Sequence, residues 1–213
     1  MAVKSDREYR DMTMEIRTAE NEEAPEERKV VRGYASTFNE PYTLYENDDW
    51  RFNEVVDSRA FDNTDMSDVI LQYDHEGRVF ARMSNNTLTV IPDEKGLLIE
   101  ADLGGTELGR QLFEEIRGGY TNKMSFGFTV DGEEIRDMKD ADGKDLTVRT
   151  ITSVRKLYDV SAVSLPANDA TSISVRSLTD GEIERIRAER LEAEALELRR
   201  RKLLARAKLN GGQ

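Results

Sequence analysis

Short runs in which apolar and polar residues alternate recur along the first 165 residues of this chain. Such alternation is typical of strands that bury one face of a sheet. The runs cover residues 7–17, 30–38, 68–75, 78–91, 97–103, 123–130, 147–156 and 157–165. Turn-forming residues separate several of them, above all Pro92 to Gly96, which predicts a hairpin. We therefore expect an α+β fold dominated by a mostly antiparallel sheet.

Two segments of this body have helical character. Residues 106–117 place Leu108, Leu112, Phe113 and Ile116 at helical spacing, and a Gly pair follows as a stop signal. A shorter helix is expected at 58–62, with Asp57 or Ser58 as its N-cap. The acidic segments 18–29 and 131–146 are expected to be loops, and the second of them a mobile hairpin loop. Residues 172–176 can form one further short strand.

The composition changes abruptly after Arg176. From Thr179 onward the chain lacks Pro and aromatic residues and is dense in Glu, Arg, Leu and Ala. Thr179 and Glu182 have the spacing of a capping box, which predicts the start of a helix. Six bases follow without an intervening acid: Arg199, Arg200, Arg201, Lys202, Arg206 and Lys208. We therefore predict two domains, a body over 1–176 and a helical, charged C-terminal tail over 177–213.

Composition excludes several classes of function. The 43 acids outweigh the 31 bases, giving a net charge of -12, whereas a duplex nucleic-acid binder needs Lys and Arg for phosphate contacts. With no Cys and one His, disulfides, Cys-ligated zinc and multi-His metal sites are excluded, and we expect no cofactor. The N-terminus lacks an apolar signal segment and no stretch approaches a membrane span, so we expect a cytosolic protein without membrane or direct nucleic-acid partners.

His75 is the single imidazole, so any histidine base must be this residue. Alternation along residues 69–75 puts it on the inner face with Val69, Leu71 and Tyr73, near the end of a strand. Two interpretations stay open at this point. His75 can close the edge of a core, or it can act in proton transfer.

Ser125 lies in a strand whose residues Met124, Phe126 and Phe128 point toward a core. Ser125 then shares the opposite face with Gly127 and Thr129, and the missing side chain at Gly127 lets a backbone or substrate approach closely. A surface serine in an ordinary strand is the simpler interpretation. A nucleophile is the alternative.

Asp159 lies on the strand face of Leu157, Val163 and Leu165, where apolar side chains are expected. A buried carboxylate needs a partner, which can be an Arg in a structural salt bridge or a histidine that the carboxylate orients. Together, Ser125, His75 and Asp159 are the groups that acyl transfer requires: a nucleophile, a base and a group that orients the base. A Ser125–Lys123 dyad is a weaker alternative.

At these residues the chain resembles the prohead, or capsid maturation, proteases of tailed bacteriophages. The resemblance is carried by His75 after an aliphatic strand, by Met124–Phe128 and by Tyr158–Ala167, and it extends over about residues 8–176. Gly33–Ala35 and Ser58–Phe61 also fit the pattern of the family. These proteins are serine proteases similar in fold to the herpesvirus assemblins, which implies a barrel-like sheet surrounded by helices.

The resemblance implies that Ser125 is the nucleophile, His75 the general base and Asp159 the acidic third residue, where many relatives have Glu. It implies an endopeptidase that cleaves scaffold, the scaffold-like segment of the major capsid protein and itself. Its partners would be the major capsid protein and the scaffold, and it would form a homodimer. It would act in the host cytoplasm, inside the assembling prohead. The competing class of function is a non-enzymatic capsid-assembly module whose site has decayed.

Overall fold

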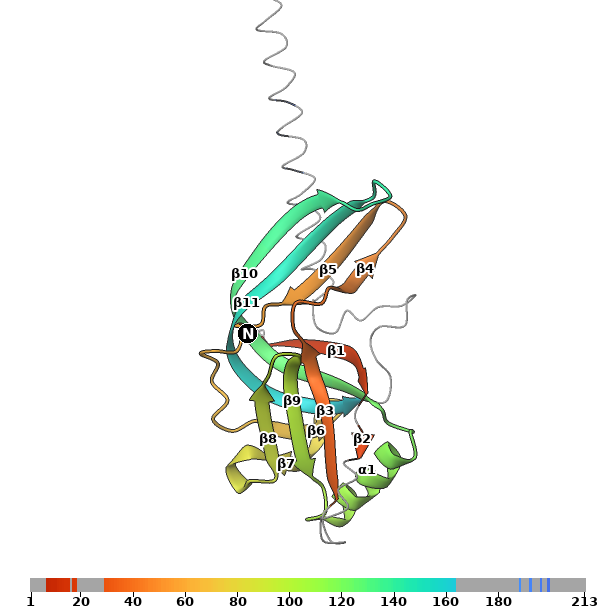
Figure 1. Cartoon of the computed structure of the whole chain (residues 1–213), viewed down its shortest axis with the longest axis vertical. Helices are drawn as coiled ribbons and strands as arrows, with labels where there is room; N and C mark the ends of the chain where they lie inside the picture. The colour runs from red at the N-terminus through yellow and green to blue at the C-terminus, as the bar shows by residue number, and fades with distance from the viewer. Residues whose placement is uncertain are drawn as a thin grey trace, which may run out of the picture. The chain divides into compact units, whose positions relative to one another are not determined.

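The structure is a computed structural model that describes residues 7–15, 17–18 and 29–163, together with the single residues Ala188, Glu192, Leu196 and Arg199. Contacts divide the chain into two units, Met1–Ser177 and Leu178–Gln213, and the strands belong to the first (Figure 1). The loop expected over 18–29 lies outside the described residues except for its ends, Thr18 in β2 and Lys29. The strand expected at 172–176 lies outside them as well, and so does the helical tail apart from the four single residues named above. The domain boundary after Arg176 stays a prediction.

The larger of two sheets is built around the longest strands. Its order is β1 (Glu8–Glu15), β10 (Lys123–Lys139), β11 (Asp145–Val163), β5 (Trp50–Val56) and β4 (Tyr42–Glu46), and β6 (Ile70–Tyr73) joins β11 with β7 (Glu76–Arg82) beside it. Most pairs are antiparallel, whereas β11 is parallel to β5 and β6. The second sheet has the order β2 (Arg17–Thr18), β3 (Val30–Thr37), β9 (Gly96–Asp102) and β8 (Leu88–Pro92).

These pairings confirm a β-rich α+β fold, and they do not support the expected barrel-like closure. Among the described strands, both sheets are open, with β2 and β8 at the edges of the smaller one. The predicted hairpin across Pro92 to Gly96 is confirmed as the β8–β9 pair. A short 3-10 turn, η1 (Met83–Asn85), separates β7 from β8, so the single run expected over 78–91 is wrong.

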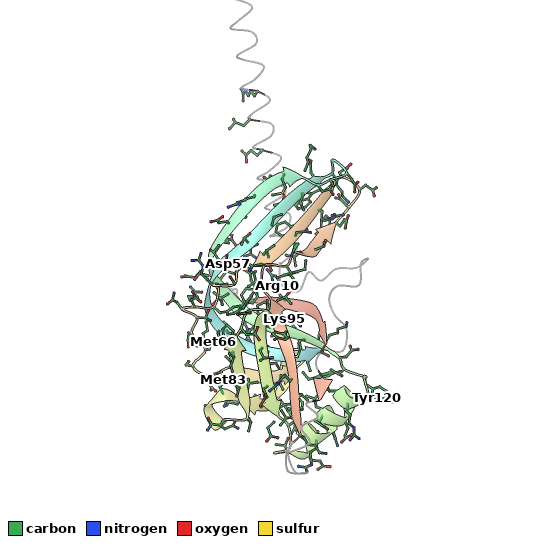
Figure 2. The ribbon with its side chains drawn as sticks, viewed as in Figure 1. Arg10, Asp57, Met66, Met83, Lys95 and Tyr120 are labelled. Atoms are coloured by element: carbon green, nitrogen blue, oxygen red, sulfur yellow. The ribbon has the colours of Figure 1, made fainter. Side chains whose placement is uncertain are left out.

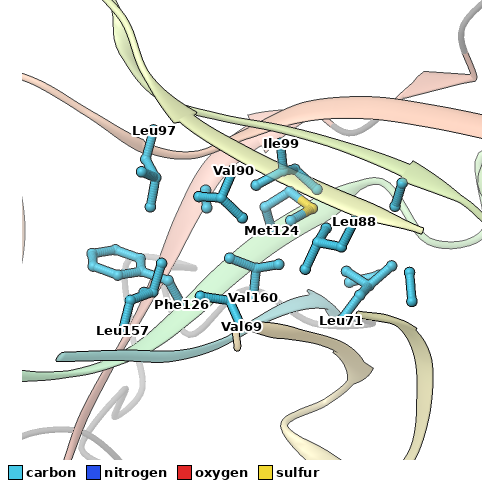
Figure 3. Packing of buried hydrophobic residues seen from close by; sticks show 14 of the residues in the cluster. Val69, Leu71, Leu88, Val90, Leu97, Ile99, Met124, Phe126, Leu157 and Val160 are labelled. Carbon is cyan, nitrogen blue, oxygen red and sulfur yellow. The ribbon is translucent and has the colours of Figure 1, made fainter. Parts of the chain in front are cut away.

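The core lies between the two sheets. Leu88, Val90, Leu97 and Ile99 of the smaller sheet face Met124, Phe126, Leu157 and Val160 of the larger one (Figure 3). Met124, Phe126 and Phe128 are fully buried, as the alternation in this strand predicts. Because successive side chains of a strand point to opposite faces, this packing directs Ser125 and Gly127 away from the core.

Helix α1 (Glu107–Arg117) begins at Thr106, whose hydroxyl accepts the backbone N–H of Gly109 as an N-cap. Leu112, Phe113 and Ile116 are buried, as expected. Leu108 is 38% exposed, so its predicted place in the packed face is wrong. At the other end Gly119 adopts φ 76°, a left-handed conformation that favours glycine.

The acid-rich segment 131–146 forms strand for most of its length, so the predicted loop is wrong. β10 continues to Lys139 and β11 begins at Asp145, and the turn between them is held by Asp140, whose carboxylate accepts the backbone N–H groups of Asp142 and Lys144. Polar side chains suit this ribbon because much of it faces solvent. We name residues 42–56 and 131–151, in which β10, β11, β5 and β4 lie side by side, the hairpin arm (Figure 1).

The helix predicted at 58–62 is a series of hydrogen-bonded turns. Ala60 and Phe61 are buried, and the carbonyl of Ala60 accepts the backbone N–H of Val154, so tertiary contacts take the place of helical hydrogen bonds. Asp57 caps the first turn by accepting the N–H of Arg59. Strands β4 and β5 were not predicted, and in β5 the reason is Glu54, which interrupts the inward apolar series of Trp50, Phe52 and Val56.

Candidate active site

His75 lies in the tight turn between β6 and β7. Asp74 and His75 have φ values of 49° and 60°, so the chain reverses through two left-handed residues. The alternation of side chains therefore ends before His75, and the prediction that His75 shares a face with Leu71 and Tyr73 is wrong. The turn is fixed to β11, because the N–H of Asp74 donates to Ala162 O and the N–H of His75 donates to Ser161 Oγ.

Ser125 lies in β10, between β1 and β11. It is paired with Asp11 of β1 and with Ser161 of β11. Its exposed fraction is 0%, so the interpretation as a surface serine is wrong. Its hydroxyl is within hydrogen-bond distance of the Arg10 carbonyl oxygen at 2.9 Å.

Asp159 lies in β11 and is also 0% exposed. Its Oδ1 is 2.5 Å from His75 Nδ1 and accepts a hydrogen bond from Ser161 Oγ at 3.2 Å. Its Oδ2 forms an ion pair with the guanidinium of Arg7. Both partners that the sequence suggested, an Arg and a histidine, are therefore present at once, one on each carboxylate oxygen.

The structure brings Ser125, His75 and Asp159 into one hydrogen-bonded row. His75 Nε2 lies 2.5 Å from Ser125 Oγ, and Nδ1 lies beside Asp159. An ionised carboxylate can only accept, so this partner assigns the imidazole proton to Nδ1 and leaves the lone pair of Nε2 facing the Ser125 hydroxyl. That tautomer is the one in which an imidazole can take a proton from a serine.

Gly127 makes room for this arrangement. It is paired with Asp159 across β10 and β11. A Cβ atom at residue 127 would lie 2.4 Å from Asp159 Oδ2, 2.8 Å from Tyr9 Cε1 and 2.9 Å from Arg7 Nε. Three side chains therefore occupy the space that any larger residue would need, which gives the close approach expected at this glycine a physical basis.

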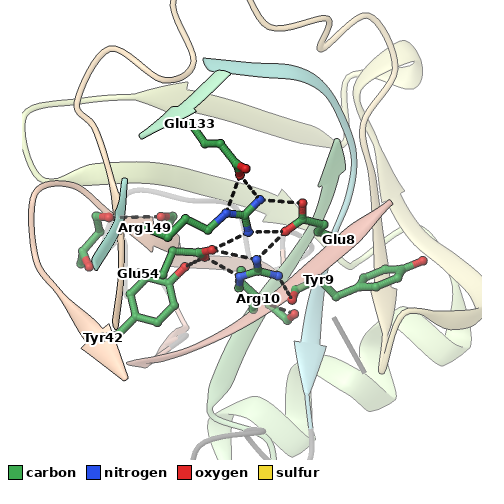
Figure 4. Close-up of polar contacts among 10 residues, drawn as sticks. Glu8, Tyr9, Arg10, Tyr42, Glu54, Glu133 and Arg149 are labelled. Atoms are coloured by element: carbon green, nitrogen blue, oxygen red, sulfur yellow. Dashed lines mark hydrogen bonds and ion pairs between the residues drawn. The ribbon is translucent and has the colours of Figure 1, made fainter. Parts of the chain in front are cut away.

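A largely buried ion cluster, with Glu133 at its exposed edge, lies on the other side of β1. It consists of Glu8, Arg10, Glu54, Glu133 and Arg149, with Tyr42 donating its hydroxyl to Glu54 (Figure 4). Arg10 and Arg149 each contact both Glu8 and Glu54, with Arg149 Nη1 2.7 Å from Glu8 Oε2 and 2.8 Å from Glu54 Oε2. Figure 2 places Arg10 where the hairpin arm meets the rest of the body.

Burial and charge shift the proton affinities in this cluster. Burial alone would lower the pKa of Arg10 and of Arg149, but the carboxylates around them outweigh it and raise both. Burial and the charge of Glu54 raise the pKa of Tyr42 well above its ordinary value, so the phenol keeps its proton. The two guanidinium groups therefore keep their charge, and the contacts of the cluster tie β1 to β5 and β11.

Sequence reasoning missed the residues around the row. Ser161 follows Asp159 by two positions on the same strand, so alternation could have placed it on the Asp159 face. Arg7 and Tyr9 carried no signal, because their contacts depend on the register of β1 against β10. Glu54 interrupts an apolar alternation, and such a carboxylate could have been predicted to need basic partners.

Comparison with known families decides the identity. Residues 13–185 match the family model described as caudovirus prohead serine protease. The chain belongs to this family. Comparisons with curated proteins and with solved structures gave no significant match. The family match includes Ser125, His75 and Asp159, whereas Arg7, Tyr9 and Arg10 precede it.

The family resemblance inferred from the sequence is thus confirmed, and prohead serine protease is the family-level activity. Within the described ranges, no group of three or more His, Asp or Glu side chains is placed to hold a metal ion. No helix among those residues has the length and apolar character needed to cross a membrane.

Proposed function

We propose that this chain is a prohead serine endopeptidase in which Ser125 is the nucleophile, His75 the general base and Asp159 the residue that orients His75. The observation that carries the proposal is the row from Ser125 Oγ through His75 to Asp159, with 2.5 Å at each step. Membership of the prohead protease family supports it independently. The same row argues against the Ser125–Lys123 dyad.

In the proposed reaction, Ser125 Oγ attacks the carbonyl carbon of the scissile peptide bond while its proton passes to His75 Nε2. The tetrahedral intermediate collapses as His75 returns the proton to the leaving amine, which breaks the C–N bond and leaves an ester on Ser125. Water then hydrolyses the ester with His75 again as base. Asp159 accepts the Nδ1–H throughout and stabilises the imidazolium that forms.

The substrates and setting are proposed from the family. We propose cleavage of the scaffold, of the scaffold-like segment of the major capsid protein and of the enzyme itself, in a prohead assembling in the host cytoplasm. The capsid protein and the scaffold would be its partners, and a homodimer its assembled state. The acidic body would be the peptidase and the basic tail from residue 177 its tether.

A non-enzymatic assembly module is the second candidate. The observation that favours it is the complete burial of Ser125 beside β1, which closes the nucleophile to a peptide in this structure. The complete row argues the other way, because a module that binds without chemistry has no need for an imidazole between a serine and a carboxylate.

The two candidates are separated by following purified full-length protein over time for shortening and for labelling by a fluorophosphonate, which reacts with activated serines. Ser125→Ala should abolish both. His75→Asn should do the same while keeping the turn, because Asn tolerates the left-handed conformation. The matched control is Ser36→Ala, a second fully buried serine, located in β3. Wild-type protein that shows neither label nor cleavage, even with scaffold added, would make the chain a binding module.

A further inference from the structure

The segment Arg7–Arg10, which leads into strand β1, presents two faces with different contacts. Glu8 and Arg10 point into the ion cluster (Figure 4). Arg7 and Tyr9, one residue earlier in each case, contact the row of Ser125, His75 and Asp159. This division follows from the alternation of side chains along an extended chain.

Every member of the row is contacted from this short segment. The Arg7 guanidinium pairs with Asp159 Oδ2. The Tyr9 ring stands edge-on to His75, with 4.4 Å between ring centroids. The Arg10 carbonyl oxygen lies 2.9 Å from Ser125 Oγ.

We propose that Arg7 is a positioning residue for the Asp159–His75 pair, an inference that rests on the proposed function. Asp159 can orient His75 only while Oδ1 faces Nδ1. A carboxylate can rotate about its terminal bond and exchange its two oxygens. Arg7 on Oδ2, together with Ser161 on Oδ1, holds one orientation.

The charge of Arg7 supports the same role. A fully buried carboxylate without a cation tends to take up a proton, and a protonated Asp159 would no longer be a pure acceptor for Nδ1–H. Burial lowers the pKa of the Arg7 guanidinium, but from an ordinary value so far above neutrality that the group keeps its charge. Arg7 therefore favours the ionised form of Asp159.

Arg7 is itself held in place. Its guanidinium carbon lies 4.5 Å from the ring centroid of Tyr158 and 5.1 Å from that of Tyr9. A planar guanidinium stacks on aromatic rings better than an ammonium does, so Lys is an incomplete substitute. The guanidinium also depends on glycine at position 127, because a Cβ there would lie 2.9 Å from Arg7 Nε.

The test uses the full chain with Arg7→Met, which keeps length and apolar bulk but removes the charge, and with Arg7→Lys. The control is Arg32→Met, an exposed arginine paired with Glu100 on the smaller sheet. We expect kcat for a scaffold peptide to fall about 10²-fold in Arg7→Met with KM little changed, since misplacement of a catalytic group has that effect. Arg7→Lys should recover part of the rate and Arg32→Met all of it.

The second readout is the ¹⁵N NMR spectrum of the imidazole, in which His75 gives the only signal because the chain has one His. The spectra are compared in a Ser125→Ala background, in which the chain cannot shorten itself. We expect the Nδ1–H tautomer with Arg7 present and a mixture of tautomers in Arg7→Met. A merely structural role would leave this spectrum unchanged.

Three results would overturn the proposal: an Arg7→Met rate equal to or above wild type, a loss of rate without a change of tautomer, or full recovery of both readouts by any bulky residue such as Leu. Should Arg7→Met fail to fold, Arg7→Lys decides by the same two readouts, because a rate and spectrum equal to wild type would contradict the need for a guanidinium. If the wild-type chain cleaves no peptide, the proposed function fails alone, and the tautomer still reports whether Arg7 positions Asp159.

Discussion

The carbonyl oxygen of Arg10 lies 2.9 Å from the hydroxyl oxygen of Ser125, although 115 positions separate the two residues. A serine hydroxyl has one proton, and His75 Nε2 lies on another side of the same oxygen. When the proton points to Arg10 it is not available to His75. In the proposed mechanism, the approach of a peptide must therefore be accompanied by loss of the hydrogen bond to β1.

Asp159→Asn should reduce kcat about 10⁴-fold, the size of loss that this change causes in a Ser-His-Asp triad. The amide can donate to Nδ1, which favours the wrong tautomer of His75. Arg7 would also lose its anionic partner, so we expect a lower midpoint in urea unfolding. Peptide cleavage and urea unfolding measure the two effects, and an unchanged kcat would remove Asp159 from the mechanism.

Gly127→Ala should impair both the site and stability. Its Cβ would lie 2.4 Å from Asp159 Oδ2, and overpacking of this kind costs about 1–3 kcal/mol. The matched control is Gly105→Ala, because a Cβ at Gly105 meets nothing within 4 Å. Denaturant unfolding and peptide cleavage should separate the two variants. Equal stability and equal cleavage rates in the two variants would show that Asp159 and its neighbours do not depend on the absence of a side chain at Gly127.

Glu54→Gln should lower the free energy of unfolding by about 3–5 kcal/mol, because it leaves Arg10 and Arg149 without one buried partner. Arg149→Met should have an effect of similar size. The control is Arg136→Met, which removes an exposed ion pair with Glu134 on the same hairpin arm and should change stability by less than about 1 kcal/mol. Unfolding in urea measures whether Glu54→Gln and Arg149→Met lose more stability than Arg136→Met. A small change in the free energy of unfolding of Glu54→Gln would mean that the cluster does not stabilise the attachment of β1 to β5 and β11.

The ion cluster also predicts an acid-dependent loss of stability. Burial alone would raise the pKa of Glu8, but its hydrogen bond with Arg149 and the charges of Arg10 and Arg149 outweigh this and lower it below 4.5. A group with a lowered folded-state pKa stabilises the protein above its unfolded pKa, and this contribution is lost as the pH falls through the folded pKa. The difference in unfolding free energy between wild type and Glu8→Gln should therefore shrink below about pH 4.5. A difference that stays constant down to pH 3 would contradict the prediction.

The tail can be tested separately. Truncation after Arg176 should leave peptide cleavage intact and abolish incorporation into proheads, because we propose that the basic tail is a tether and the body the peptidase. A lone helix of this composition is marginally stable and easily cut. Cleavage assays on the truncated protein and its recovery from proheads are the two measurements. Lost activity in solution, or normal incorporation, would show that the tether interpretation is wrong.

The sequence predicted the parts of this fold that alternate cleanly. Met124, Phe126 and Phe128 lie in the core, and the α1 helix follows its apolar spacing. β5 was missed because its inward face includes Glu54, whose burial is made possible by Arg10, Arg149 and Tyr42 from distant strands. The alternation of apolar and polar residues along one strand cannot predict the burial of a carboxylate whose partners come from other strands.

The same limit applies to the candidate site. Ser125, His75 and Asp159 were singled out from the sequence by their residue types and by the family resemblance, although the strand pattern put His75 on the wrong face. Their neighbours Arg7 and Tyr9 could not, since the register of β1 against β10 decides which residues reach the site. The left-handed turn at His75 was also hidden, because neither Asp74 nor His75 is a glycine.

Strands β10 and β11 run without a break from the hairpin arm to the site, so Glu133 and Ser125 share one strand and Arg149 and Asp159 share the other. Their pairing shifts register four times between Gly127 and Glu133, and such bulges bend a strand and increase its twist. We therefore expect a substitution on the arm that alters this twist to shift Ser125 and Asp159, the proposed nucleophile and its carboxylate. The effect of such a substitution would then depend on the continuity of β10 and β11 rather than on its direct distance from the proposed site.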